Sequence, residues 1–409
     1  MRRIHSADII KSVMIIVVII IHRIFYDWSG YQGPVEESDG VLLMIFGFFG
    51  AMGSIFAYIT GLVTSFAVYN RLKQKRNSPK QIILASVATL FLLLVINYVI
   101  IFFFAGGIYI NDQFHYGVIT NGLRTGEWVV PGLEIISLYA GVLMIIGISG
   151  FITTLVAVLL NKGRGIEKVN RNKKTFIALG LLVLIVSPIL SPILEPMGFE
   201  VFNNSNYILA GVLTNLAALD FPVLPILGFA LIAAALGTCL ASGTEYKRII
   251  KNWRRKAWIL VVIGLVLGVL FLIQGTLVFD FARYVHLGIY ILVTIALLKR
   301  FEFKSNEHTN KYPNLNRFGK VTLTIFILET PLAAVLHLIP NIISDSWDTK
   351  LPLVLIFALI NVWFWHLVIK YWEKVGYRWS FEWMIAKTIK LISGKSSDKI
   401  KNPPTSPIK

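Results

Sequence analysis

The sequence predicts an all-α fold, a polytopic transmembrane bundle of about ten helices with both termini in the cytoplasm. Three observations support this prediction. Of the 409 residues, 56% are hydrophobic and only 15% are charged, and the mean hydropathy is +0.70. Apolar runs long enough to cross a hydrocarbon core of about 30 Å recur along the whole chain. Loops rich in Lys and Arg alternate with loops that are acidic or sparse in charge.

The apolar segments set the number of spans, because each contains about the 20 residues that a membrane-crossing helix needs. They fall at 7–25, 41–69, 81–110, 133–160, 175–195, 222–243, 256–278, 283–300, 318–339 and 351–372. An eleventh short or re-entrant segment, within 107–132 or 199–221, stays open. Residues 1–373 thus form one transmembrane domain.

Two segments carry local signals. Four glycines in the second segment permit close helix approach; they are Gly47, Gly50, Gly53 and Gly61. In the fifth segment, Pro188, Pro192 and Pro196 predict a bend or an end of the helix, whose freed carbonyls need partners.

Beyond the last span, residues 374–392 predict an interfacial amphipathic helix. The polar, basic and proline-rich residues 393–409 predict a disordered tail.

Charge fixes the orientation and limits the partners. Basic loops precede the first segment and follow every second one, which places them in the cytoplasm by the positive-inside rule. The net charge of +17 therefore does not indicate nucleic-acid binding, and no aromatic-interleaved basic module lies outside the helices. The cationic face can instead attract anionic lipids or a phosphorylated cosubstrate. Cys239 is the only cysteine, which excludes an intramolecular disulfide and a cysteine-based metal cluster.

The first segment carries the strongest functional signal. Asp8, Lys11 and His22 interrupt an Ile/Val/Met-rich helix. Lys11 and His22 differ by only about 20° around the helix axis and stand about 16 Å apart along it, and Asp8 lies one turn before Lys11. Ionisable groups at membrane depth face a protein interior or a watery cavity by default. The sequence therefore predicts that this stripe belongs to a functional site.

Each residue of this stripe has two interpretations. Asp8 and Lys11 form either a structural pair with a snorkelling lysine, or a pair that presents Lys11 to an anionic group. His22 is either an interfacial histidine or a general base, because imidazole titrates near neutral pH.

Four further residues are candidates for substrate binding, each with a structural alternative. Arg283 and His286 lie one turn apart at the outer end of the eighth segment, where we expect water to reach them. Glu329 lies in the middle of the ninth segment, and Asp220 suits an N-cap ahead of Pro222. No helix carries a His-x-x-x-His or carboxylate–histidine pair at ligand spacing, so no metal site is predicted.

Five stretches resemble a family of membrane acyltransferases, heparan-α-glucosaminide N-acetyltransferase and its bacterial and archaeal kin. SADIIK (6–11), followed by an apolar run to His22, resembles the family's Asp-x-x-Arg-Gly…His opening. The other stretches are FAYITGL (56–62), LDFPVLPILGFALIAAALG (219–237), FGKVTLTIFILETPL (318–332) and YRWSFEW (377–383). Each motif alone is weak, but together they span nearly the whole chain in order.

The chain departs from the family pattern at several positions. Lys11 stands where the family usually has Arg, Ser12 where it has Gly, and Glu329 where it often has Gln or His. Lysine keeps the charge of arginine but lacks its planar fork. The family's catalytic histidine lies in the exterior loop after the first helix. That loop has no histidine here, and His22 is the nearest substitute.

The resemblance implies an integral-membrane acyltransferase of the cell membrane. Acetyl-CoA or another acyl-CoA would be the cosubstrate, approaching from the cytoplasm, where Arg71, Arg171 and Arg255 of the basic loops would contact its phosphates. His22 would deprotonate an amine or hydroxyl of a sugar or cell-envelope glycoconjugate at the outer face.

Two other classes stay open. One is a secondary transporter or flippase for a polar lipid or sugar, which bent helices and buried charges suit equally. The other is a structural or regulatory membrane subunit. The oligomeric state, a homodimer included, also stays open.

Overall fold

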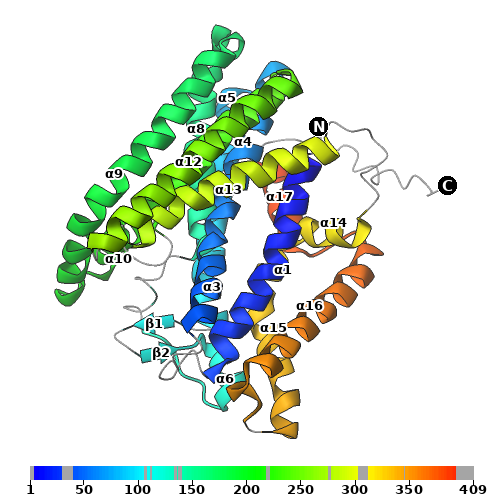
Figure 1. Cartoon of the computed structure of the whole chain (residues 1–409). Helices are drawn as coiled ribbons and strands as arrows, with labels where there is room; N and C mark the ends of the chain where they lie inside the picture. Colours follow the sequence, from blue (N-terminus) through cyan, green and yellow to red (C-terminus); the bar gives the residue numbers. More distant parts are fainter. Residues whose placement is uncertain are drawn as a thin grey trace.

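A computed structural model describes residues 4–29, 40–105, 108–110, 113–132, 136, 141–217, 222–274, 278–302, 312–344 and 346–392. These residues form an all-α polytopic helical bundle (Figure 1), as the sequence predicts. Nine helices of this part of the chain are long and apolar enough to cross a membrane. The chain is therefore a multi-pass membrane protein.

The long helices coincide with the predicted apolar segments, and the structure adds two short strands and several short helices between them. The first half contains α1 (His5–Asp27), α3 (Gly40–Gly50), α4 (Ile55–Lys73), α5 (Pro79–Phe104), β1 (Ile108–Ile110), β2 (Gln113–His115), α6 (Val118–Thr125), α8 (Val142–Asn161) and α9 (Val169–Asn203). The second half contains α10 (Tyr207–Ala217), α11 (Val223–Ala241), α12 (Tyr246–Gln274), α13 (Val278–Phe301), α14 (Pro313–Lys320), α15 (Thr322–Ile343), α16 (Leu351–Glu373) and α17 (Phe381–Ile392).

Three regions of the chain bear on the predicted number of spans. The predicted segment 256–278 corresponds to the apolar part of α12, which ends at Gln274; residues 275–277 lie outside the described part of the chain. The region 107–132 forms an antiparallel β1–β2 pair and the short α6, and the region 199–221 contains α10. An 11-residue helix reaches only about 16 Å, so α10 cannot cross a bilayer alone.

Helix α11 is the centre of the larger group of helices. Its residues are almost all buried, and α4, α9 and α8 pack around it. A Cβ atom at Gly61 would lie 2.0 Å from the Ala230 carbonyl oxygen, so α4 and α11 approach closely there, as predicted. A Cβ atom at Gly47 would meet no described residue within 4 Å, so this glycine makes no close contact with the part of the chain that the structure describes.

The prolines of α9 do not end the helix. It runs for 35 residues through Pro188, Pro192 and Pro196. Because Pro188 has no N–H, the carbonyl of Leu184 loses its helical partner. The Tyr284 hydroxyl on α13 donates to that carbonyl at 3.2 Å, which supplies the partner that the sequence requires.

A second group of helices surrounds α1. Helices α14, α15 and α16 pack against it around the buried residues Ile15, Ile19, Ile325 and Trp365. Of residues 374–392, predicted as an interfacial helix, Phe381–Ile392 form the helix α17, and residues 374–379 form a turn before it. The Glu382 carboxylate of α17 accepts hydrogen bonds from the N–H of Leu323 and the hydroxyl of Thr324, both at 2.6 Å, and so caps the N-terminus of α15. The predicted disordered tail, 393–409, lies outside the described residues.

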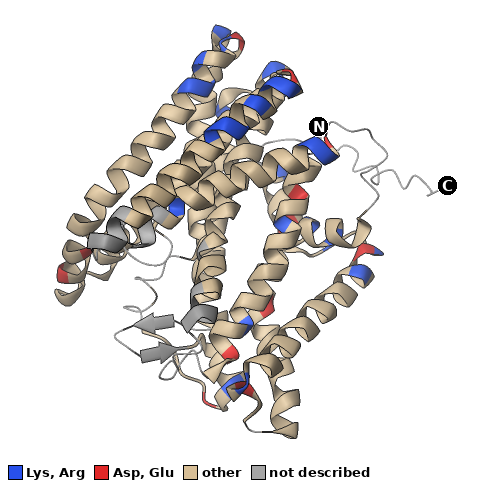
Figure 2. Ribbon diagram, viewed as in Figure 1, with Lys and Arg blue, Asp and Glu red and all other residues tan. Residues whose placement is uncertain are grey.

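The charges follow the predicted alternation. Figure 2 shows that Lys and Arg gather at one end of the larger group, where α4 ends, α5, α9 and α12 begin, and α13 ends. This is the face that the positive-inside rule assigns to the cytoplasm.

Candidate functional site

The outer half of α1 carries a buried ionic network. Arg23 and Asp27 stand four residues apart on α1, and the Arg23 guanidinium donates to the Asp27 carboxylate at 2.9 Å. Both residues are almost completely buried. A buried charge requires a partner with good geometry, since water cannot replace it. The helical i,i+4 spacing supplies that partner locally.

Glu329 connects this network to α15. Its side chain is 1% exposed and accepts from three groups. These are the Nδ1 of His22, an Nη atom of Arg23 at 3.3 Å, and the Thr330 hydroxyl at 2.8 Å. The carboxylate is therefore fully held, and its position fixes the orientation of the His22 ring.

The network continues to the outer helix α6. The Arg124 guanidinium pairs with Asp27 and donates to the Tyr26 carbonyl at 2.9 Å and the Tyr116 hydroxyl at 3.0 Å. Burial, and then the nearby Arg23 charge, lower the pKa of Arg124. A guanidinium titrates so far above neutrality that Arg124 keeps its charge. Three separate elements, α1, α15 and α6, thus meet through one set of ion pairs.

The arrangement gives His22 the features of a general base. Glu329 also pairs with Arg23, so it is ionised and accepts a hydrogen bond from the Nδ1–H of His22. In the neutral ring Nε2 is then the acceptor nitrogen, and it has no hydrogen bond to any described residue. The His22 side chain is 22% exposed, and its ring lies 5.0 Å from that of Tyr26. A histidine oriented through Nδ1 by a carboxylate can take a proton at Nε2.

The other two predicted residues of α1 form a separate pair. Lys11 Nζ lies 2.9 Å from the Asp8 carboxylate, and Asp8 is buried while the Lys11 side chain is 30% exposed. The chain passes closely over this pair at Gly319, since a Cβ there would lie 2.4 Å from the Asp8 carbonyl oxygen. The i,i+3 pairing is as predicted, but the pair lies about 16 Å along the helix from His22.

The predicted outer residues of α13 do not join the network. His286 is 1% exposed, and its ring stacks on Tyr290 with centroids 6.0 Å apart. The expectation that water reaches His286 is therefore wrong: the ring is covered by neighbouring aromatic side chains, Phe48 among them. Arg283 is half-buried. Asp220 lies outside the described residues.

The three arginines predicted to contact phosphates lie at the basic end. Arg171 donates to the Leu160 carbonyl at 3.0 Å and to the Asn172 amide oxygen, so it stabilises the start of α9. Arg71 is half-buried at the end of α4. Arg255 is exposed and lines a cleft of about 660 Å³ with Lys173, Arg248 and Lys256. Of the three, only Arg255 lines this basic cleft.

Sequence reasoning missed Arg23, Asp27 and Arg124 as members of the site. A signal for the first two was present, because an Arg and an Asp at i,i+4 in an apolar segment predict an internal ion pair. The contact of Arg124 depends on how the outer loop folds back, which no local pattern reveals. No protein-family model matches the chain, and no curated protein sequence matches it.

Proposed function

We propose that this protein is an integral-membrane acyltransferase that moves an acyl group, such as acetyl, from cytoplasmic acyl-CoA to an amine or hydroxyl at the outer face of the cell membrane. One observation carries the proposal: His22, on the apolar helix α1, is held through Nδ1 by the buried carboxylate of Glu329. Base and orienting acid on two packed helices are typical of group-transfer sites.

The chemistry assigns one role to each residue. Nε2 of His22 takes the proton from the acceptor, whose oxygen or nitrogen attacks the thioester carbonyl carbon. The new C–O or C–N bond forms, the C–S bond breaks, and the CoA thiolate leaves with the proton that His22 held. Glu329 is a positioning residue that keeps the ring in the productive tautomer, and Arg23 keeps Glu329 ionised.

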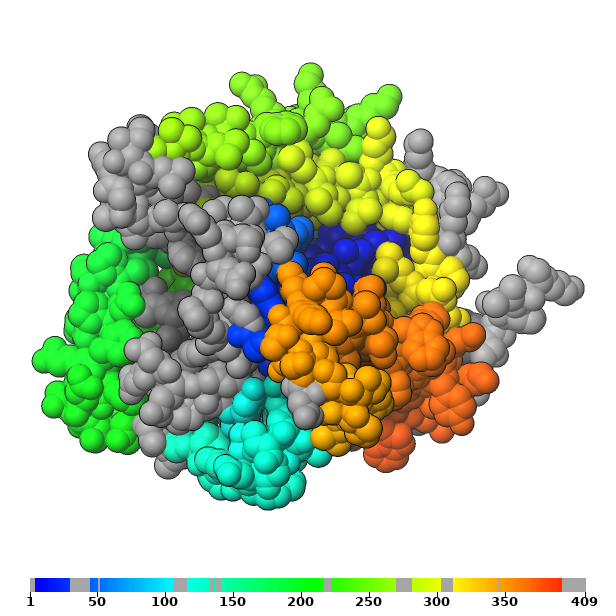
Figure 3. Space-filling view, turned by 60° about the horizontal axis from the view of Figure 1, so that its bottom comes forward, coloured from blue at the N-terminus to red at the C-terminus, as the bar shows by residue number. Residues whose placement is uncertain are grey.

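The surroundings leave room for a substrate beside α1. Figure 3 shows α1, in dark blue, at the base of a recess between the orange segment of α15 and α16 and a yellow segment of the chain. At the basic end, Lys173, Arg248, Arg255 and Lys256 line a cleft whose cations suit the phosphates of CoA. In this proposal the cations of the cleft hold the CoA phosphates at the cytoplasmic side, the acyl thioester extends through the bundle to His22, and the recess receives the acceptor.

The test measures acetyl transfer in membrane vesicles that contain the full chain, supplied with radiolabelled acetyl-CoA and glucosamine. We expect His22→Gln to lower the rate of acetyl-glucosamine formation by about a hundredfold or more, because general-base catalysis contributes about 10²–10⁴. Glu329→Gln should also lower kcat, with a smaller effect on KM. Equal rates for the His22→Gln variant and the original protein would refute the proposal.

Two matched variants control for general damage. His366→Gln removes a half-buried histidine from α16, and Glu195→Gln removes an exposed carboxylate from α9; both should keep the original rate. Accumulation of unmodified glucosamine inside the vesicles, with no acetylated product, would instead support the transporter class.

A further inference from the structure

Helix α12 presents one continuous stripe that changes from basic to apolar. Lys251, Arg255, Trp258 and Val262 stand four, three and four residues apart, so they lie on one helix face. The apolar part continues, since Trp258, Val262 and Val269 are 55%, 54% and 58% exposed. The stripe is thus open to the surroundings along its described length.

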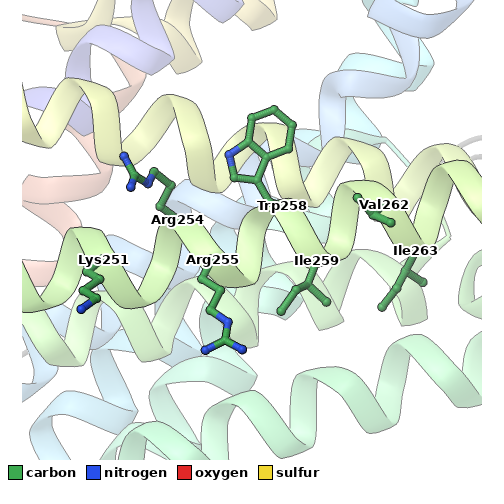
Figure 4. A pocket seen from close by; sticks show the side chains of 7 residues that line it. All are labelled: Lys251, Arg254, Arg255, Trp258, Ile259, Val262 and Ile263. Atoms are coloured by element: carbon green, nitrogen blue, oxygen red, sulfur yellow. The ribbon is translucent and has the colours of Figure 1, made fainter.

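A shallow groove runs along this stripe. It has a volume of about 580 Å³ and is lined by Lys251, Arg254, Arg255 and the apolar side chains that follow them. Figure 4 shows the three cations at one end of the helix, Arg254 on one side and Lys251 and Arg255 on the other, with Trp258 and then the aliphatic side chains beyond them. The groove is therefore amphipathic along its axis.

The opposite face of α12 packs against the rest of the protein. Trp253 and Ala257 are buried, and α12 packs closely on α13. A Cβ atom at Gly288 of α13 would lie 2.8 Å from the Ala257 carbonyl oxygen. The helix is therefore fixed from behind, and the stripe does not turn inward.

We infer that this groove binds one anionic phospholipid of the cytoplasmic leaflet. Its phosphate would lie among Lys251, Arg254 and Arg255, and its acyl chains would follow the apolar stripe. Basic side chains next to a membrane-spanning surface attract anionic headgroups through charge complementarity.

The dimensions of the stripe fit a lipid. From Trp258 to Val269 the helix rises about 17 Å, close to the depth of one leaflet, which is half of a core of about 30 Å. A soluble phosphate compound would use the cations but leave the apolar stripe in contact with other lipids. A second protein copy would have to bring carboxylates to the same three cations. The combination of cations and leaflet-long apolar surface therefore favours the phospholipid.

The first measurement is native mass spectrometry of the full chain from mixed micelles of phosphatidylglycerol and phosphatidylcholine. We expect the protein to retain phosphatidylglycerol preferentially. The variant Lys251→Gln with Arg254→Gln should weaken this retention by about tenfold or more, because each cation near an anionic surface contributes about fivefold. These two residues line the groove but not the cleft proposed for CoA, so acetyl transfer should be unchanged.

The matched control removes the same charge elsewhere on the basic face. Arg76→Gln with Lys80→Gln changes two exposed cations at the α4–α5 turn, and retention should change less than about twofold. An equal loss in both double variants would mean that only the overall charge attracts the lipid, and would overturn the inference.

A second measurement places the lipid at Trp258. Brominated phosphatidylglycerol should quench more fluorescence than brominated phosphatidylcholine, and Trp258→Phe should remove the difference. Equal quenching by the two lipids would overturn the inference. Displacement of phosphatidylglycerol by glycerol phosphate alone would also overturn it, because the apolar stripe would then not contribute to binding. The same holds if the protein forms a dimer that excludes the lipid from the groove and if Val262→Trp dissociates that dimer.

Discussion

The two halves of α1 carry similar charged groups but use them differently. In the outer half, Arg23 and Asp27 pair with each other and with partners on α15 and α6. In the inner half, Lys11 pairs with Asp8 one turn away on the same helix. The outer charges therefore connect separate elements of the fold, whereas Lys11 and Asp8 are paired within one helix.

Burial explains the difference. The Arg23 side chain is 1% exposed and cannot reach water, but the Lys11 side chain is 30% exposed and can. A buried cation needs fixed anionic partners, so its helix can pack in only one way against the helices that supply them. A half-exposed lysine extends its ammonium toward the membrane surface and imposes no such restriction. The outer charges should thus determine how α15 and α6 pack on α1, and the half-exposed ammonium of Lys11 should be able to contact a ligand.

The largest expected effect comes from Arg23→Met, which removes the shared partner of Asp27 and Glu329. Breaking a buried ion pair costs about 3–5 kcal/mol, because the remaining charge stays buried without compensation. The free energy of SDS-induced unfolding in mixed micelles should fall by that amount.

The corresponding substitution in the inner half is Lys11→Met. Like Arg23→Met, it replaces a cation of α1 with methionine. It should lower the unfolding free energy by less than about 1 kcal/mol. Similar losses in the two variants would show that the two halves do not differ as proposed.

The next effect is on the outer contact of α6. Arg124→Met removes its pair with Asp27 and its hydrogen bond to the Tyr26 carbonyl, but Asp27 keeps Arg23. We expect a loss of about 2 kcal/mol. Amide hydrogen exchange over 118–125 should accelerate by at least tenfold, with little change in α11. Unchanged exchange in α6 would mean that this ion pair does not hold the helix in place.

A smaller effect is expected from Thr330→Val, which keeps the side-chain shape but removes the hydroxyl that donates to Glu329 at 2.8 Å. A hydrogen bond to a charged group contributes about 1.5–3 kcal/mol. We expect the lower end of this range, since His22 and Arg23 still hold the carboxylate. The same micelle titration measures it, with Thr322→Val as the control, whose hydroxyl donates to the Phe318 carbonyl at the end of α14.

The fold was more predictable than the site. Spans α1, α5, α8, α11 and α16 follow directly from apolar length, because in lipid a backbone must satisfy its own hydrogen bonds. The prolines of α9 were harder. Their effect depends on whether another helix offers a donor, and Tyr284 of α13 does so from 100 residues away.

The site was predictable one residue at a time but not as a network. Apolar context singled out His22 and Glu329 separately, since each is expensive at membrane depth. Their contact spans 307 residues of sequence and depends on the packing of α15 against α1. His286 was instead expected at the water-accessible outer end of its segment, yet the structure covers it with aromatic rings. Sequence patterns reveal which residues must be shielded from lipid, but packing decides which partner shields them.

The smallest expected change in stability, and the sharpest test of the inner half, comes from Lys11→Gln. Because the Lys11 side chain is 30% exposed, its pair with Asp8 contributes below about 1 kcal/mol. If the lysine presents its charge to the anionic donor, KM for acetyl-CoA should nevertheless rise about fivefold, as expected for one lost cation. Lys11→Arg keeps the charge and should restore KM. A change in unfolding free energy without a change in KM would show that Lys11 only stabilises α1. The charged groups of both halves of the helix would then contribute to stability alone, and the proposed difference between them would be wrong.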